Sequence, residues 1–284
     1  MAASKPVAVI VNESGDVALD GQLVVGTTEE IVELTDGCVC CTVRGDLVAA
    51  VTRLLARRKA WFRPLRFERL IIETSGLASP GPVVQTFLLD PVLSAETRVD
   101  GVIAVASAAD LARALELHPL SIEQLAVADA VVLNHVDRAD ADAAETLVRA
   151  HNPTAPLWRA HHADVDVGPL LDLGGHDAAR WQMAATSHVE AAHVTLSTDR
   201  PVDLPRLKVF LQFVAARRTW TLWRLKGLFH CSGLQRAVVA HGVFQWLQLG
   251  PGAMAAPTTS TLVLIGRDFD RAEIERGWAV VVGG

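Results

Sequence analysis

The sequence lacks the long apolar segments of membrane and secreted proteins. None of its uninterrupted apolar runs approaches the ~18 residues that a membrane-spanning helix needs. Its N-terminus has one lysine and an apolar stretch confined to residues 7–11, whereas the apolar region of a secretory signal takes about 7–15 residues. We therefore expect a soluble protein of the cytoplasm.

The composition also lacks an excess of basic residues, and lysine in particular is scarce. The 284 residues contain 26 Lys and Arg against 32 Asp and Glu, a net charge of −6, and only four of the basic residues are lysines. A mildly acidic chain with dispersed charge is not suited to coat nucleic acid or an anionic membrane, so we expect neither as a partner. Half of the residues are hydrophobic, which supports a sizeable core and excludes a disordered chain.

Only four cysteines are present, and three of them, Cys38, Cys40 and Cys41, lie within four residues. Disulfides between such close neighbours are strained, so the cluster favours a metal site. Thiolates are preferred by zinc, copper(I) and similar soft ions. Three sulfurs leave a fourth position for Glu13, a nearby aspartate or a histidine, which suits a metal that is released again. Buried packing or a redox thiol is the alternative interpretation, and it is the one we favour for the isolated Cys231.

Short apolar runs alternate with amphipathic helical patterns over the first 165 residues. This alternation predicts an α/β fold with a doubly wound, mostly parallel sheet. The alternation of apolar runs and helical patterns ends after residue 173, and we expect a second, smaller α+β domain to follow. We therefore place the domains at residues 1–178 and 190–284. In the first domain we expect strands at 7–11, 70–72, 101–105 and 130–133, helices at 46–59, 109–117 and 142–150, and a Pro/Gly loop after Gly76.

Two polar clusters follow expected strands of the first domain. Glu73-Thr74-Ser75-Gly76 follows the strand at 70–72, and Asn134-His135-Val136-Asp137 follows the strand at 130–133. Loops at the carboxyl ends of parallel strands build the ligand site of such sheets. The second cluster is similar to the N-K-x-D motif with which P-loop GTPases read guanine, although four residues with one mismatch are a weak signal alone.

In combination, the order of these motifs resembles the CobW family of metal-handling P-loop GTPases. The resemblance covers nearly the whole chain. The segments that carry it are V-I-V-N-E-S-G-D-V-A-L-D-G (9–21), L-T-D-G-C-V-C-C-T-V-R-G-D-L (34–47), E-T-S-G-L-A-S-P (73–80), Q-L-A-V-A-D-A-V-V-L-N-H-V-D (124–137), H-N-P-T-A-P (151–156), R-L-K-G-L-F-H (224–230) and L-V-L-I-G-R-D-F-D (262–270).

The resemblance implies a GTPase whose nucleotide state gates the transfer of a metal, often zinc, to a metal-requiring client protein. Carried over by position, Cys38, Cys40 and Cys41 hold the metal, and Glu13 lies in the switch that links nucleotide to metal. The remaining implied roles belong to the nucleotide: Glu73 lies near the magnesium ion, Gly76 senses the γ-phosphate, and Asn134, His135 and Asp137 form the base site.

The sequence departs from the family at the phosphate-binding loop. GTP hydrolysis needs a G-x-x-x-x-G-K-[ST] loop, yet none of the four lysines follows a glycine or precedes Ser or Thr. In the family this loop precedes the segment that matches residue 6, and its strand lies centrally in the sheet, so its absence is expected to expose strand edges on both neighbours. Either the true N-terminus is missing from this chain, or the protein is a nucleotide-deficient relative, which His135 in place of the family's lysine supports.

Three functions remain open from the sequence. The first is a GTP-dependent metallochaperone, the second is a metal carrier without nucleotide hydrolysis, and the third is a scaffold that acts through the C-terminal domain. His161 and His162 are adjacent and are expected to point apart, so we interpret them as part of a surface loop and not as a metal pair.

Overall fold

The computed structural model describes residues 6–12, 30–34, 43–62, 64–74, 76, 78–175 and 193–283. The chain divides into two compact units, Met1–Arg98 and Val99–Gly284, and each is described by itself. Among the described residues, no helix is both long enough and apolar enough to cross a bilayer.

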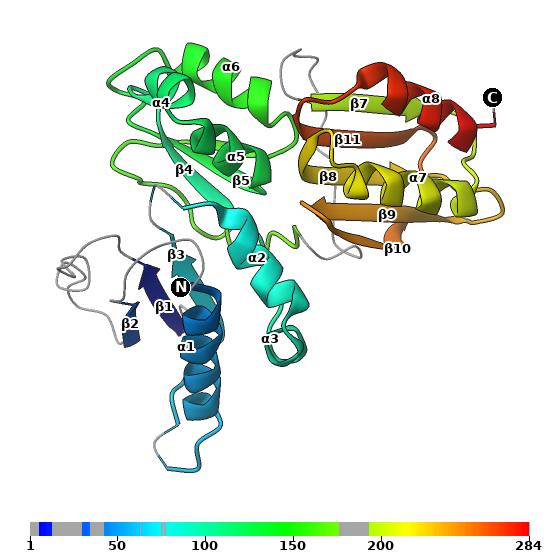
Figure 1. The fold of residues 1–284 in the computed structure, drawn as a ribbon. Coiled ribbons are helices and arrows are strands. Elements are labelled where there is room, and N and C mark those ends of the chain that lie inside the picture. The colour runs from blue at the N-terminus through cyan, green and yellow to red at the C-terminus, as the bar shows by residue number, and fades with distance from the viewer. Residues whose placement is uncertain are drawn as a thin grey trace. The chain divides into compact units, whose positions relative to one another are not determined.

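The first unit is built on a three-stranded parallel sheet in the order β2-β1-β3. The central strand β1 pairs along its length with both neighbours, with Ile10 opposite Val32 on one side and Ile72 on the other. Apolar side chains of α1, among them Leu47, Val51 and Leu54, are buried. The elements of this unit are β1 (Val7–Asn12), β2 (Glu30–Leu34), α1 (Val43–Arg58), β3 (Arg69–Glu73), α2 (Pro80–Leu89) and α3 (Pro91–Glu96) (Figure 1).

The Pro/Gly loop expected after Gly76 is wrong, because α2 begins at Pro80. A proline at the first helical positions removes an N–H group that has no partner within the helix, and its fixed φ suits the helix. The next helix, α3, also starts with a proline, Pro91, and its N-cap Asp90 accepts hydrogen bonds from the N–H groups of Val92 and Leu93, each 3.0 Å long. Prolines in this segment therefore start helices instead of preventing them.

The second unit begins with another three-stranded parallel sheet, in the order β4-β5-β6. The strand β5 is buried over Ala130–Leu133, which explains its uniformly apolar sequence. Helical side chains such as Leu111, Leu125 and Val148 pack with Val131 and Leu133 in one core. The elements are β4 (Ile103–Ser107), α4 (Leu111–Leu117), α5 (Pro119–Val127), β5 (Ala130–Asn134), α6 (Ala141–His151) and β6 (Leu157–Arg159).

Parallel strands with covering helices confirm the predicted fold class, but the described strands form two parallel sheets instead of one. In the described parts of the chain, β3 is an end strand of its sheet and β4 is an end strand of the other. Both carry exposed apolar side chains, with Ile71 on β3 and Ile103 and Val105 on β4.

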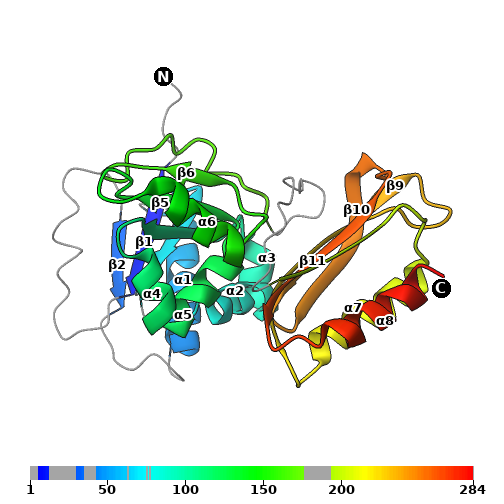
Figure 2. The ribbon, with the colours of Figure 1, turned by 90° about the horizontal axis from the view of Figure 1, so that it is seen from above.

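The rest of the second unit is an antiparallel sheet of five strands in the order β10-β9-β8-β11-β7, which confirms the predicted α+β domain. The helices α7 and α8 lie side by side on one face of this sheet (Figures 1 and 2). They enclose a core that contains Phe210, Phe229 and Trp278. The elements are β7 (His193–Thr198), α7 (Leu204–Ala216), β8 (Thr221–Phe229), β9 (Arg236–Val243), β10 (Trp246–Ala255), β11 (Ser260–Arg267) and α8 (Arg271–Val281).

Candidate functional site

The predicted base-reading segment lies at the carboxyl end of β5, where it meets the loop that follows β4. Ser107 of β4 pairs with Asn134 of β5 in the parallel register, and the N–H of Ala108 donates to the Asn134 carbonyl at 2.8 Å. The loops that follow both strands therefore leave the sheet at the same edge. This is the position in which parallel α/β sheets bind ligands.

The ring of His135 is oriented by Ser107, which is held in turn by Asp110. Its Nδ1 lies 3.1 Å from Oγ of Ser107, and that hydroxyl donates to Oδ2 of Asp110 at 2.8 Å. Because the Ser107 proton is used on the carboxylate, Oγ accepts the hydrogen bond and His135 carries its proton on Nδ1. In the neutral ring, Nε2 is then left as an acceptor. The residue has φ 59°, a left-handed conformation that is uncommon outside glycine.

The loop after β6 contributes the remaining contacts of this segment. Oδ1 of Asn134 accepts a hydrogen bond from the Ala163 N–H at 2.9 Å, and Nε2 of His161 lies 3.1 Å from Oδ2 of Asp137. His161 and His162 are both exposed and stack edge to face, with ring centroids 4.2 Å apart. The surface-loop interpretation of these two histidines is thus confirmed, but the expectation that they point apart is wrong, because their rings are in contact. The described residues contain no group of three or more His, Cys, Asp or Glu placed to hold a metal ion.

The other predicted nucleotide residues lie in the first unit. Glu73 is the last residue of β3 and is exposed, and Gly76 is exposed with open space around the position of a Cβ atom. Neither residue is therefore committed to the packing of its unit. Their predicted roles at the magnesium ion and the γ-phosphate stay predictions.

The predicted metal ligands Cys38, Cys40, Cys41 and Glu13 lie outside the described residues. Cys231, by contrast, is fully buried in the core of the five-stranded sheet, which confirms its interpretation as a packing residue. Burial raises the pKa of its thiol to about 11. Since the thiolate is the form that binds metal, this shift makes metal binding by Cys231 less favourable.

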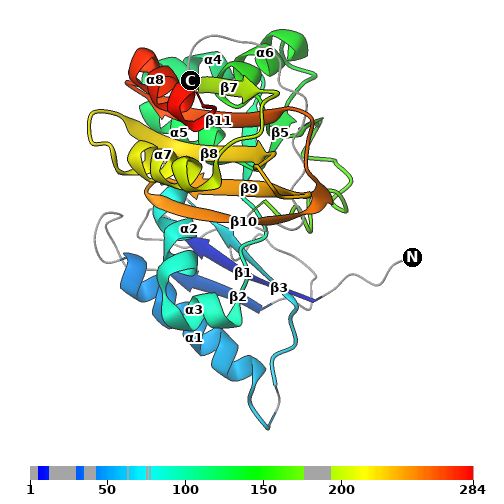
Figure 3. The same ribbon diagram turned by 90° about the vertical axis from the view of Figure 1, so that its right-hand side faces the viewer.

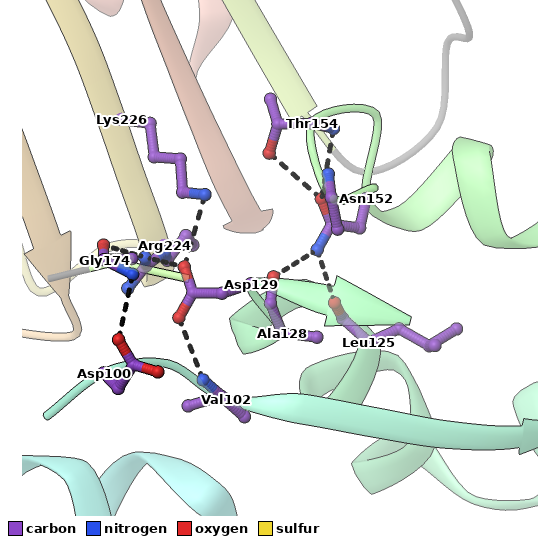
Figure 4. A network of polar contacts seen from close by, with 12 residues as sticks. Asp100, Val102, Leu125, Ala128, Asp129, Asn152, Thr154, Gly174, Arg224 and Lys226 are labelled. Carbon is purple, nitrogen blue, oxygen red and sulfur yellow. Dashed lines mark hydrogen bonds and ion pairs between the residues drawn. The ribbon is translucent and has the colours of Figure 1, made fainter. Parts of the chain in front are cut away.

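A buried charge cluster that the sequence analysis missed joins β5 to β8 (Figure 4). Asp129 immediately precedes β5, and its Oδ1 pairs with the guanidinium of Arg224 and with Nζ of Lys226 at 3.3 Å. Its Oδ2 accepts from the Val102 N–H at 3.1 Å. All three charged side chains are nearly inaccessible to solvent, and Arg224 also donates to the Gly175 carbonyl at 3.1 Å. We call Asp129, Arg224 and Lys226 the buried triad.

The backbone next to the buried triad leaves space for the Asp129 carboxylate and is fixed by hydrogen bonds. A Cβ atom on Gly175 would lie 2.4–2.7 Å from the carboxylate atoms of Asp129, so only glycine leaves room for this carboxylate. The carboxylate of Asp100 accepts hydrogen bonds from the N–H groups of residues 172, 173 and 174, at 2.6, 3.2 and 3.1 Å. The segment that leads into the triad is therefore fixed by backbone hydrogen bonds as well as by Arg224.

Lys226 should make the stability of the protein depend on pH. Burial lowers its pKa from 10.5 to about 8, although Asp129 opposes the shift. Between these pH values the unfolded state holds a proton that the folded state has released, so the free energy of unfolding rises with pH, by as much as about 3 kcal/mol. Urea unfolding at a series of pH values from 7 to 10.5 measures this rise. Lys226→Met removes the titrating amine, and an equal rise in that variant would contradict the assignment.

Comparison with known proteins adds to this geometry. Residues 1–159 match the family model described as "CobW/HypB/UreG, nucleotide-binding domain", and residues 191–282 match "Cobalamin synthesis protein cobW C-terminal domain". The chain is 28% identical over 285 residues to "Zinc chaperone YjiA" of Escherichia coli (strain K12), which covers 96% of this chain and 89% of that protein. It is 35% identical over 202 residues to "Zinc chaperone CobW" of a Sinorhizobium species, covering 60% of this chain and 55% of that protein.

Solved structures agree on the fold. The "Crystal structure of Zn(II)-bound YjiA GTPase from E. coli" superposes with a TM-score of 0.77 at 22% sequence identity, over 98% of this chain and 90% of that chain. A triple mutant of the same GTPase, also bound to Zn(II), gives a TM-score of 0.79. At this identity the likeness establishes the fold.

Proposed function

Because the chain belongs to the CobW/HypB/UreG family, we propose that it is a zinc metallochaperone that passes its metal to a client protein under the control of guanine nucleotide. The observation that carries the proposal is the C-V-C-C segment at 38–41, which lies within the part of the chain that matches the family. Relatives named as zinc chaperones or as zinc-regulated GTPase metalloprotein activators support both the metal and the existence of a client.

Zinc is cargo in this proposal. The thiolates of Cys38, Cys40 and Cys41 bind it, and Glu13 supplies the fourth, more labile ligand. Thiolates select zinc over the hard cations of the cell, and a weak fourth ligand gives a client a position at which to enter. Cys231 takes no part in this proposal, because it is fully buried in the apolar core of the five-stranded sheet.

The nucleotide part of the proposal rests on the loop at the end of β5. Asp137 is exposed at the ligand-binding edge of the sheet, where it can accept the hydrogen bonds of a guanine base, and Asn134 braces that loop through Ala163. This exposure and position support the proposed base site. The 284 residues contain no loop that fits the triphosphate, so no hydrolytic step is derived from this chain. Glu73 and Gly76 are proposed to contact magnesium and the γ-phosphate of GTP.

Metal binding is tested by titrating the protein with cobalt(II), whose absorption reports thiolate ligands. We expect one cobalt ion per chain with an intense thiolate-to-metal band, because three sulfurs surround the ion. Cys40→Ser should weaken binding by at least about ten-fold, in line with the loss of one ligand from a metal site. Cys231→Ala is the matched control and should bind as the unmodified protein does. Failure of the unmodified protein to bind cobalt or zinc near one per chain would contradict the proposal.

The second candidate function is a metal carrier without nucleotide hydrolysis. The specific observation in its favour is His135, which stands where the family has lysine and whose Nδ1 is engaged by the Ser107 hydroxyl. The two functions are separated by the DNA upstream of the Met1 codon. An in-frame segment that encodes the phosphate loop supports the GTPase, and a segment without it supports the carrier.

A further inference from the structure

The connection between α1 and β3 exposes two consecutive aromatic side chains. Trp61 is 102% exposed and Phe62 is 82% exposed, which makes them the two most exposed large hydrophobic residues in the described part of the chain. Residues 59–62 and 64–68, which we call the aromatic loop, turn back beyond the C-terminal end of α1 (Figure 3). Single exposed apolar residues are ordinary on protein surfaces, but an adjacent Trp-Phe pair at a projecting turn is not explained by the fold.

Basic residues are concentrated around this pair. Residues 53–69 contain seven Arg or Lys and one acidic residue, a formal charge of +6, whereas the whole chain carries −6. Among the described residues of this segment, the basic side chains that are exposed are Arg53, Arg57, Arg58, Lys59 and Arg66. The dispersed charge expected from the composition is therefore wrong at this place, because the total conceals a local excess of positive charge.

The aromatic loop is anchored without the help of its aromatic tip. Nζ of Lys59 pairs with Oε1 of Glu96 at 2.6 Å, and the guanidinium of Arg58 lies over the ring of the buried Phe67, 5.5 Å from its centroid. The N–H of Leu65 donates to the Arg57 carbonyl at 3.1 Å, which closes the turn. These contacts fix the base of the loop, so the tip projects from a defined support.

We propose that the aromatic loop binds the surface of an anionic lipid bilayer. Tryptophan is favoured at the level of the lipid headgroups, where its ring is partly buried and its N–H stays hydrated. Arg and Lys next to the bilayer are attracted by anionic lipids, and their apolar stems can lie along the surface while the charges reach the phosphates. The two interactions act together, which is the condition for stable attachment of a protein that does not span the membrane.

The shape of the loop favours a bilayer over other anionic partners. Single-stranded nucleic acid is bound along a groove, on aromatic rings that form a platform. The aromatic loop is a projecting turn, and its third aromatic ring, Phe67, is buried and covered by Arg58. An acidic protein would have to supply a pocket of matching shape, whereas a bilayer accepts a projecting side chain of any outline.

Vesicle co-sedimentation of the full chain tests the proposal. Vesicles of phosphatidylcholine with roughly 30% phosphatidylglycerol are compared with vesicles of phosphatidylcholine alone, at about 0.1 M salt. We expect partitioning to be at least ten-fold stronger with the anionic vesicles. Trp61→Ser with Phe62→Ser should lower it about ten-fold or more, and Arg53→Glu with Arg66→Glu should lower it and weaken its salt dependence. Binding that is equal on both kinds of vesicle, or absent from both, would overturn the proposal.

Matched controls and a second readout separate this loop from general stickiness. Val209→Ser and Arg276→Glu alter an exposed apolar and an exposed basic residue elsewhere, and both should leave partitioning unchanged. Lipids brominated in their acyl chains should quench tryptophan emission of the unmodified protein, and Trp61→Phe should abolish that quenching. Trp61-dependent binding of an oligonucleotide of about 30 nucleotides, without vesicle binding, would assign the loop to nucleic acid instead. Cobalt binding should be unchanged in every variant, because none of them touches the cysteine segment.

Discussion

Replacement of Asp129 by alanine is expected to lower the free energy of unfolding by about 3–5 kcal/mol, the cost of removing one partner from a buried ion pair. The substitution leaves the guanidinium of Arg224 buried without its carboxylate, and it leaves the buried amine of Lys226 without its partner. It also removes the acceptor of the Val102 N–H. Urea unfolding at pH 7, followed by circular dichroism, measures the loss.

A surface ion pair provides the control for this experiment. Oδ1 of Asp142 lies 2.5 Å from the guanidinium of Arg159, but the Asp142 side chain is 85% exposed. Exposed pairs contribute about 0–1 kcal/mol, so Asp142→Ala should be tolerated. Replacing the buried triad with Leu, Met and Met should recover much of the stability lost in Asp129→Ala, since well-packed apolar groups can replace a buried ion cluster. A loss in Asp129→Ala no larger than that in Asp142→Ala would show that the triad is not buried in solution.

Replacement of Asn152 by alanine is expected to cost about 3 kcal/mol through several unmade hydrogen bonds. The side chain is fully buried, and its Nδ2 donates to the carbonyls of Leu125 and Ala128 at 2.7 and 2.8 Å. Its Oδ1 accepts from the N–H groups of Thr154 and Ala155 and from the Thr154 hydroxyl, at 3.2, 3.0 and 3.1 Å. Thermal or urea unfolding of the variant gives the cost.

Two further substitutions test the assignment of these atoms. Asn152→Asp should be at least as damaging as Asn152→Ala, because it sets a carboxylate oxygen against two carbonyl oxygens. Thr154→Val removes a single hydroxyl contact and should cost only about 1 kcal/mol. Similar losses in Thr154→Val and Asn152→Ala would mean that Asn152 does not hold the end of α5 to the turn before β6.

The sequence predicted those elements whose residue pattern is determined by burial alone. The apolar runs of β1, β3 and β5 were found because burial alone explains their composition. The strand β4 starts at Ile103, two residues after the expected position. Its pairing with β5 begins there, and Gly101 lies outside the paired residues. The helices α2 and α3 were missed because the prolines that start them also signal turns.

The polar residues of the candidate site were predicted from the sequence, but the buried triad was not. The position of Asn134–Asp137 came from the rule that polar residues after parallel strands gather at one sheet edge, and the resemblance to a family supplied their roles. The buried triad could not be found in this way, since Asp129 and Arg224 are separated by 95 residues and only the tertiary structure brings them together. The one available signal was a carboxylate directly before a strand with no other polar residue in its interior.

The buried triad limits how freely the two regions that match separate family models can be exchanged between proteins. Its acid lies in the first region, at Asp129, and its bases lie in the second, at Arg224 and Lys226. A C-terminal region taken from a protein without these bases would bury an uncompensated carboxylate, and a first region without the acid would leave Arg224 buried without a counter-charge. We therefore expect that a chimera of the two regions assembles only if it carries all three residues together with Gly175.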